Sequence, residues 1–205
     1  MASQALQDFE ARLDDVQQLI DAHDALTRLR RAEASLQAGG QVLGNIAIVI
    51  QHLVTDPGAG RRKEVHALNN AGIVLLSGHL QGFIVDIHKE SAGALFAGHV
   101  QSVEAVTGAA YTRGNPNPQN IRKVFRTLGF DDVFDGLSWQ NMSTAALKKK
   151  LLDFNTLRNQ IVHGANQRVR KQVLANHLRV FRTFATRLDA KLRREIRIVT
   201  GMNPW

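Results

Sequence analysis

Cysteine is absent from the 205-residue sequence, which excludes a disulfide framework and any metal site built on thiolates. Aromatic residues make up only 6% of the chain and are scattered, so no platform for stacking single-stranded nucleic acid is evident. No uninterrupted apolar run approaches the roughly 20 residues that a bilayer span needs, and residues 1–16 are amphipathic and acidic, unlike a secretion signal. We therefore expect a cytoplasmic protein that makes no membrane contact.

The motifs of several enzyme classes are also missing. No cluster of carboxylates and histidines has metal-ligand spacing, no glycine-rich loop is placed to cradle phosphates, and no nucleophile elbow is present. Internal repeats, low-complexity segments and strand-type alternation of apolar and polar residues are absent too. The sequence therefore predicts neither a metal site nor a cofactor.

Acidic residues are outnumbered by basic ones. The chain has 26 Lys and Arg against 18 Asp and Glu, a net charge of +8, and most of the surplus lies in residues 148–197. That segment holds fourteen Lys or Arg and only three acidic residues. Because such a field attracts phosphate-rich ligands, we expect a nucleic-acid partner, with mere solubility as the alternative.

Apolar residues at helical spacing account for most of the chain. Helices are predicted over residues 3–36, 64–96, 119–128, 143–163 and 170–199, with loops at 56–63, 114–118 and 129–139. Residues 42–54 could be a helix or a strand, and their spacing favours a helix. The predicted fold is all-α: a bundle of long antiparallel helices with an extra N-terminal helix. We expect residues 1–60 to be a helical extension that packs on a core domain, residues 61–205.

The segment from Leu147 to Gly164 carries an unusual charge. Leu147, Leu151, Phe154 and Ile161 share one helix face, and Arg158 falls near the middle of that apolar stripe. A guanidinium stays charged and is costly to bury without a partner. The sequence therefore predicts an anion beside Arg158. It could be a carboxylate of the fold, such as Asp153 or Asp86, or a bound phosphate.

A histidine closes the same helix. Gly164 is a typical left-handed C-terminal residue, which places His163 in the last turn, where the helix dipole favours protonated imidazole. Asn159 adds an amide beside Arg158. Residues five apart point about 140° away from each other. Arg158 and His163 can therefore share one site only if the helix end unwinds or two such helices meet. Alternatively, His163 is simply a cap.

An arginine followed by a histidine with four to six residues between them is not a rare pattern. About two such pairs are expected by chance in a sequence of this composition. The sequence contains three such pairs: Arg61 with His66, Arg158 with His163, and Arg170 with His177. The first lies in a Gly/Pro loop, where a solvated charge cluster is expected, and the third is predicted on the exposed side of the last helix. Only the middle pair lies on an apolar stripe with a polar neighbour and a helix end.

The segment LRNQIVHG, with an amphipathic helix before it and a basic loop and long helix after it, resembles the HEPN superfamily. Those all-α domains carry an Arg-polar-x(3–5)-His motif. The segments ALNNAGIVLLSGHLQGFIVDI and NPNPQNIRKVFRTLGF are similar to the RiboL-PSP-HEPN subfamily, and the likeness covers about residues 64–198. Gln81 stands where the family pattern has an acidic residue, and His79 and Gln81 would face the cleft if their helix lines it.

The resemblance implies a metal-independent endoribonuclease that works as a homodimer, with two motifs facing each other across a composite active site. Many such proteins are toxins or act in phage defence, so an antitoxin or regulatory protein is a further expected partner. The alternative is a non-catalytic RNA-binding or protein-interaction module of the same fold. A third hypothesis is a small-molecule nucleotide binder that uses the same arginine.

For the enzyme, the resemblance implies a role for each motif residue. His163 would be the base, or an acid/base shuttle between protomers, and Arg158 would neutralise the phosphate. Asn159 would orient the imidazole or the phosphate. Cleavage would leave a 2′,3′-cyclic phosphate and a 5′-hydroxyl. Three basic residues just after the motif would extend the RNA-binding track: Arg168, Arg170 and Lys171.

Overall fold

The computed structural model describes residues 1–38, 61–97, 99–111 and 114–205, and this part of the chain is helical throughout its regular structure. Its helices are α1 (Gln4–Ala38), α3 (Arg61–Leu95), α4 (Val100–Tyr111), α5 (Pro118–Arg126), α6 (Thr144–Val162) and α7 (Lys171–Thr200). The described ranges contain no strand, only an isolated bridge between Trp139 and Met142. The predicted all-α fold is confirmed.

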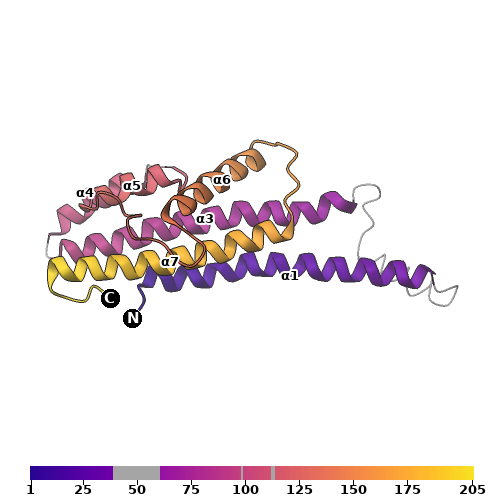
Figure 1. Ribbon diagram of the computed structural model, residues 1–205, viewed down its shortest axis with the longest axis horizontal. Coiled ribbons are helices and arrows are strands. Elements are labelled where there is room, and N and C mark those ends of the chain that lie inside the picture. Colours follow the sequence, from indigo (N-terminus) through magenta and orange to yellow (C-terminus); the bar gives the residue numbers. More distant parts are fainter. Residues whose placement is uncertain (39–60, 98, 112–113) are drawn as a thin grey trace.

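Three long helices form the body of the molecule. Helix α3 contacts all the other helices of the described chain, and α1 and α7 also contact each other. Figure 1 shows α1, α3 and α7 lying lengthwise together, with α4, α5 and α6 covering one side. α1 runs opposite to α3 and α7, whereas α3 and α7 run in the same direction, so the bundle is only partly antiparallel. Both termini lie at the same end.

Buried aromatic and aliphatic side chains from every layer fill the interior. Phe9 of α1 lies 5.0 Å from Phe83 of α3, and Phe134 stacks 6.0 Å from Phe184 of α7, measured between ring centroids. All four rings are buried. Burial of each such side chain contributes about 1.5–3 kcal/mol, so α1 shares the same apolar core as α3 and α7.

The start of α1 is fixed by acidic side chains from the other two long helices. The Ser3 amide donates to Asp189 at 3.1 Å, and the amides of Gln4 and Ala5 donate to Glu90. Glu90 therefore caps α1 from α3 and satisfies amides that a helix start leaves unpaired. Desolvation raises the pKa of Glu90, and the bonds from Ala5 and Gln4 oppose that rise.

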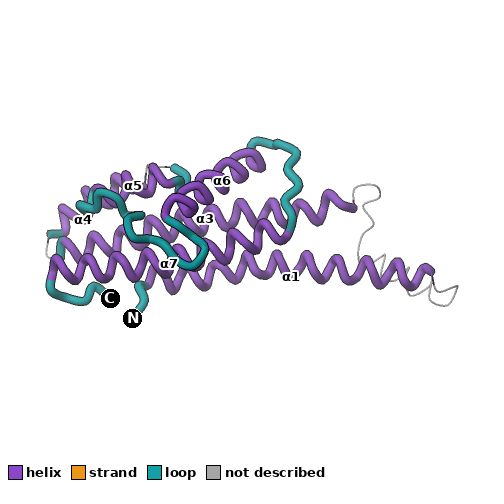
Figure 2. The backbone as a smooth tube through the Cα atoms, viewed as in Figure 1, coloured by secondary structure: helices purple, strands orange, loops and turns teal. Residues whose placement is uncertain are grey.

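The central helix has unusual composition. By length and apolar content alone, His66–Leu95 could cross a membrane, because it contains an 18-residue stretch with a mean hydropathy of 1.2. The sequence had not suggested such a segment, because polar residues interrupt the apolar run. Here α3 is instead enclosed by helices on several sides (Figure 2), and the central helix of a globular bundle has the same composition.

Most predicted helices are confirmed with small shifts in their ends. The exceptions are α4, which was not predicted, and Arg61–Lys63, which were placed in a loop but form the start of α3. Residues 42–54, with their undecided assignment, lie outside the described residues. α1 does pack on α3 and α7, but the domain boundary at residues 60 and 61 stays a prediction.

Candidate functional site

Helix α6 is held in place by its cap and its apolar stripe. The Ser143 hydroxyl accepts a hydrogen bond from the Ala146 amide at 3.2 Å, as predicted for an N-cap. Leu147, Leu151 and Phe154 are fully buried. The buried end of α6 therefore fixes the position of the polar residues that follow on its last two turns.

The end of α6 is a Schellman motif. The Gly164 amide donates to the Ile161 carbonyl at 3.2 Å, and the Ala165 amide donates to the Gln160 carbonyl at 2.9 Å. Gly164 has φ of +79°, the left-handed conformation predicted from the sequence. His163 is the last residue before this turn, and its side chain is exposed.

Arg158 lies half-buried, and its guanidinium is only partly satisfied. Its Nη1 donates to Asn159 Oδ1 at 3.2 Å, whereas its Nε is shielded from solvent and has no partner in the described chain. A shielded donor of this kind costs about 1–3 kcal/mol if nothing binds it. The side chain therefore keeps capacity for an acceptor.

Neither carboxylate proposed as its partner reaches Arg158. Asp153 pairs with Lys149 on α6 at 2.7 Å, and Asp86 pairs with Arg12 of α1 at 3.4 Å. The prediction of an internal carboxylate is therefore wrong for the described residues, because both acids face other cations. A bound phosphate as the anion stays a prediction.

Asparagines of the loop before α5, and of the first turn of α5, brace the motif. Asn115 donates to Asn159 Oδ1 at 3.0 Å, so this oxygen accepts from both Asn115 and Arg158. The buried Asn155 donates to the Pro116 carbonyl at 3.2 Å, and Asn120 donates to the Asn115 carbonyl at 2.9 Å. The loop is thus tied to α6 at two points, which fixes the Asn159 amide.

Within one chain, Arg158 and His163 do not meet. The described structure shows no contact between Arg158 and His163, and α6 stays regular as far as Val162. The helix end is therefore not unwound, which was one of the two ways to bring these residues together. The remaining way is a second α6.

A connector, residues 164–170, leads from α6 to α7 along the N-terminal part of α3 (Figure 2). The Val169 carbonyl accepts from Asn69 at 2.9 Å and from the His66 ring at 3.1 Å. The Gln167 carbonyl accepts from Asn70 at 2.9 Å. One face of α3 therefore holds the segment that follows the motif.

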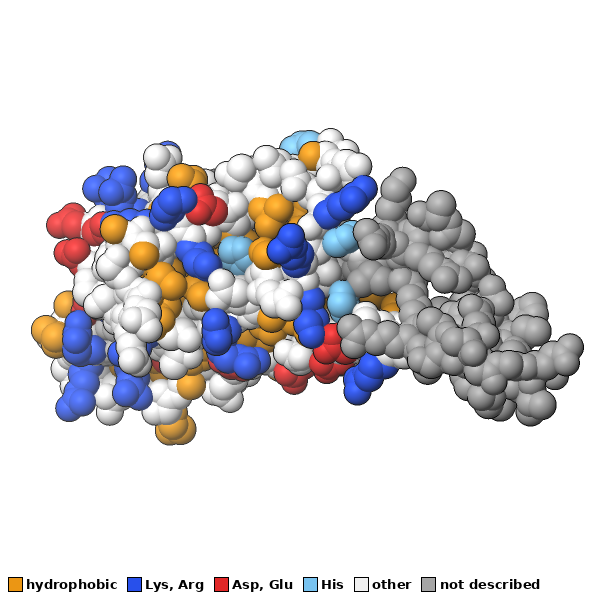
Figure 3. Space-filling view, turned by 45° about the vertical axis from the view of Figure 1, so that its right-hand side comes forward, with side chains coloured by type: hydrophobic (Ala, Val, Ile, Leu, Met, Phe, Trp, Pro, Cys, Tyr) orange, Lys and Arg blue, Asp and Glu red, His pale blue; other side chains and the backbone are white. Residues whose placement is uncertain are grey.

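The three basic residues predicted to extend an RNA track differ in their surroundings. Lys171 makes a close ion pair with Asp24 of α1, with distances of 2.8 and 3.0 Å. Hydrogen bonding to Lys171 is the main cause that lowers the pKa of the partly exposed Asp24 carboxyl. Arg168 and Arg170 are exposed and have no carboxylate partner within the described residues. On the face of the molecule that Figure 3 displays, Lys and Arg side chains are spread out and do not form a single patch.

His79 and Gln81 point to different neighbours. His79 Nε2 lies 3.5 Å from Asp15 of α1, on the side away from the motif, and desolvation lowers the pKa of its imidazole. Gln81 borders a small cavity that Asn115 also lines, and it is therefore near the loop that braces Asn159. Of the two residues, only Gln81 lies close to Asn115, which holds Asn159 of the motif.

The expected exposure of His177 is wrong. The residue is buried, with ring centroids 4.9 Å from Phe154 and 5.6 Å from Phe181. Desolvation lowers the pKa of His177 to about 4, so it is neutral at physiological pH. His66 also differs from expectation, because it binds the connector and is not part of a solvated cluster.

Sequence reasoning missed the polar side chains that support the motif. These are Asn69, Asn70, Asn115 and Asn155, together with His66. A signal was available in α3, because positions 66, 69 and 70 share one face of an otherwise apolar helix. No group of three or more His, Asp or Glu in the described chain could hold a metal ion.

Comparison with known families agrees with this arrangement. The family model described as RiboL-PSP-HEPN matches residues 101–193, which include α5, α6, the connector and most of α7. Comparisons with curated proteins and with solved structures found no significant match. The matched region contains the whole Arg158–His163 motif, and HEPN domains are ribonuclease-like or RNA-related modules. Over residues 101–193 this chain is therefore similar to the RiboL-PSP-HEPN family of the HEPN superfamily, and the resemblance read from the sequence is confirmed for that region.

Proposed function

We propose that this protein is a metal-independent endoribonuclease that acts as a homodimer, in a toxin or phage-defence role. The observation that carries the proposal is the state of Arg158. Its guanidinium has no carboxylate partner in the described chain, and its Nε is buried without an acceptor. A backbone phosphate of RNA supplies the missing anion, because a guanidinium binds phosphate oxygens in a two-pronged geometry.

The reaction needs a base, an acid and charge stabilisation. The ribose 2′-oxygen attacks the adjacent phosphorus as its proton passes to the imidazole of His163, and the bond from phosphorus to the 5′-oxygen breaks. A proton from an imidazolium goes to the leaving oxygen, which yields a 2′,3′-cyclic phosphate and a 5′-hydroxyl. Arg158 stabilises charge on the phosphate, and Asn159 positions it.

The outer face of α6 supports a dimer. Leu152, Asn159 and His163 are spaced by seven and four residues and so lie in one line on the helix. Leu152 is 56% exposed, unusually high for a large apolar side chain within an amphipathic helix. A second copy on this face covers Leu152 and brings two motifs into one cleft.

The test is cleavage of bulk RNA and tRNA in EDTA. His163→Ala is expected to lower the cleavage rate roughly 100-fold or more, as the loss of a general acid–base does. Arg158→Lys is expected to be impaired as well, because a lysine cannot make the paired contact. His99→Ala and Arg187→Lys, at exposed positions on other helices or turns, are the matched controls. The fragments should accept a 5′ label from a kinase without prior phosphatase treatment.

The alternative is a non-catalytic RNA-binding or protein-interaction module. One residue favours it: the uncharged Gln81 borders the cavity that Asn115 also lines, at a position where the resemblance implies an acid. RNA binding without cleavage by the wild type would support the module and exclude the enzyme. Equal cleavage by wild type and His163→Ala would show that the activity comes from elsewhere. Growth arrest on expression, relieved by His163→Ala, would support the toxin role.

A further inference from the structure

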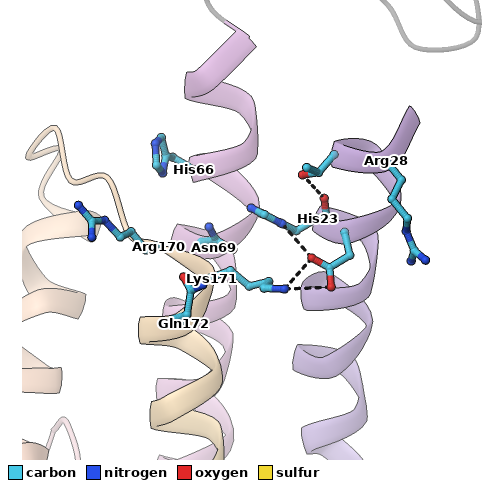
Figure 4. Close-up of a pocket in the computed structure, with 9 residues that line it drawn as sticks. His23, Arg28, His66, Asn69, Arg170, Lys171 and Gln172 are labelled. Carbon is cyan, nitrogen blue, oxygen red and sulfur yellow. Dashed lines mark hydrogen bonds and ion pairs between the residues drawn. The ribbon is translucent and has the colours of Figure 1, made fainter. Parts of the chain in front are cut away.

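A cavity of about 580 Å³ lies between α1, the N-terminal part of α3 and the start of α7. Figure 4 shows the side chains that line it: His23 from α1, His66 and Asn69 from α3, and Arg170 and Lys171 at the start of α7. Its volume falls in the range of roughly 300–1,000 Å³ that is typical of small-molecule sites. It is separate from the Arg158 motif on α6 and includes α1, which lies outside the family match.

The floor of this cavity carries acceptors. Asn69 is 1% exposed, and its amide nitrogen donates to the Val169 carbonyl, so its oxygen is left as a buried acceptor without a partner in the described chain. A carbonyl can only accept, so His66 donates to Val169 from Nδ1. The Nε2 of neutral His66 is then a second acceptor.

The α7 side of the cavity carries donors and positive charge. Arg170 is the N-cap of the 30-residue helix α7 and provides no side-chain cap. The amides of Lys171 and Gln172 therefore remain without an acceptor in the described structure, at the positive end of the helix dipole. Arg170 stands at one side of the opening and Arg28 at the other, both directed outward (Figure 4).

The carboxylate of Asp24 adds a negative charge to this cavity, so the cavity does not bind anions through positive charge alone. This carboxylate binds Lys171 and also lies 3.4 Å from His23 Nδ1. The lysine charge is thus compensated inside the cavity, which leaves the α7 amides as the anion-binding element, with the Arg170 charge at the rim of the opening. The ligand that fits has one anionic end for α7 and a second end with donors for the Asn69 oxygen.

We propose that this cavity binds a small phosphate monoester that carries free hydroxyl groups. The phosphate lies on the first-turn amides of α7 beside Arg170, and a hydroxyl donates to Asn69 Oδ1. None of the cavity's residues belongs to the Arg158 motif, although Arg170 and Lys171 are also predicted to extend the RNA-binding track. His66 and Asn69, which line the cavity, also bind the Val169 carbonyl of the connector that leads from His163, so an occupied cavity stabilises that segment.

The test is calorimetric titration of the full chain with ribose 5-phosphate. Binding is expected for the wild type, with at least tenfold weaker binding of methyl phosphate, inorganic phosphate and ribose. Arg170→Glu is expected to weaken ribose 5-phosphate binding at least tenfold. Arg168→Glu is the matched control: it makes the same charge change two residues earlier, outside the cavity, and should stay within twofold of the wild type.

Circular dichroism melts of both variants should match the wild type, since both side chains are exposed. No binding of ribose 5-phosphate by the wild type would overturn the proposal. Equal affinity for inorganic phosphate would also overturn it, because that result describes an anion site without hydroxyl recognition. An equal loss in Arg168→Glu and Arg170→Glu would point to general electrostatics and likewise reject the site.

Discussion

Individual polar residues at the motif owe their positions to partners far away in sequence. Asn159 is held by Asn115, which is 44 residues earlier in the chain. The same Asn159 oxygen also accepts a hydrogen bond from Arg158. Asn115 therefore helps to position the guanidinium indirectly, through the Asn159 side chain. Positioning residues of this kind increase the reaction rate because they hold the catalytic side chains in one geometry.

Asn115→Ala tests this brace. Loss of one hydrogen bond of about 1 kcal/mol is expected to slow RNA cleavage roughly five- to tenfold, since a factor of ten corresponds to about 1.4 kcal/mol. The thermal midpoint should fall only slightly. Asn176→Ala, on the α7 surface, is the control and should cleave like the wild type. A normal rate in Asn115→Ala would mean that Asn159 is positioned without the loop.

His177 predicts a dependence of stability on pH. Its pKa is about 4 in the folded protein and near 6.5 when unfolded, so the unfolded chain binds more protons between these values. Stability is therefore complete above about pH 6.5 and falls as the pH is lowered towards 4. The loss at pH 5 is about 2 kcal/mol from this group.

His177→Phe should remove most of that acid sensitivity. Phenylalanine fits the contacts with Phe154 and Phe181 and cannot be protonated. The measurement is the thermal midpoint of both proteins at pH 7.5 and pH 5. The wild type should lose about 4–8 °C more than the variant. Equal losses would mean that protonation of His177 is not coupled to unfolding.

At this scale, local sequence patterns could predict only part of the motif's surroundings, for a physical reason. Periodicity places Arg158 on the apolar stripe because that property is local, and it finds the end of α6 for the same reason. The contacts of Asn115 and Asn69 depend on how helices pack, which no local pattern contains. His177 was misplaced because its polarity outweighed its spacing: it lies three residues after Leu174 and four before Phe181, on the buried face.

At the scale of elements, the end of α6 depends on one glycine. Gly164 adopts φ of +79°, which L side chains rarely adopt, although the space around its Cα is open. Open space means that a substitution there is penalised by backbone strain alone. The same Schellman turn sets where His163 and the connector begin.

Gly164→Ala is therefore expected to destabilise the protein by about 1–2 kcal/mol. Gly78 in the middle of α3 also has open space around it, but its backbone is helical, so Gly78→Ala should stabilise by about 0.5–1 kcal/mol. Urea unfolding of both variants measures the difference. If both substitutions changed the free energy of unfolding in the same direction, the assignment of backbone strain to position 164 would be wrong.

Element boundaries were predictable where caps and breakers mark them. Ser143, Pro118 and Gly164 each carry a local signal, and α5 and α6 begin or end beside them. The helix α4 was missed because its sequence is short, small-residue rich and without a distinct stripe. It packs against α3, a contact between helices that no local pattern contains.

For the whole molecule, the proposed dimer gives the clearest prediction. Leu152→Glu places a charge on the exposed apolar position of α6 and should shift the protein to a monomer and abolish cleavage together. Ile198→Glu, at another exposed apolar position near the C-terminus, is the control and should leave both unchanged. Light scattering coupled to size exclusion measures the mass. A Leu152→Glu monomer that still cleaves RNA would refute the composite site.

The place of α3 at the centre of the bundle has a practical consequence. The family match begins at residue 101, after α3 has ended, and so leaves out the helix that α1, α6 and α7 all contact. A fragment limited to the matched residues would lack α3, and the apolar faces of α6 and α7 that pack against α3 would be exposed to water. Anyone who trims this gene to its recognisable part should expect inclusion bodies, and the loss of activity would then say nothing about the chemistry.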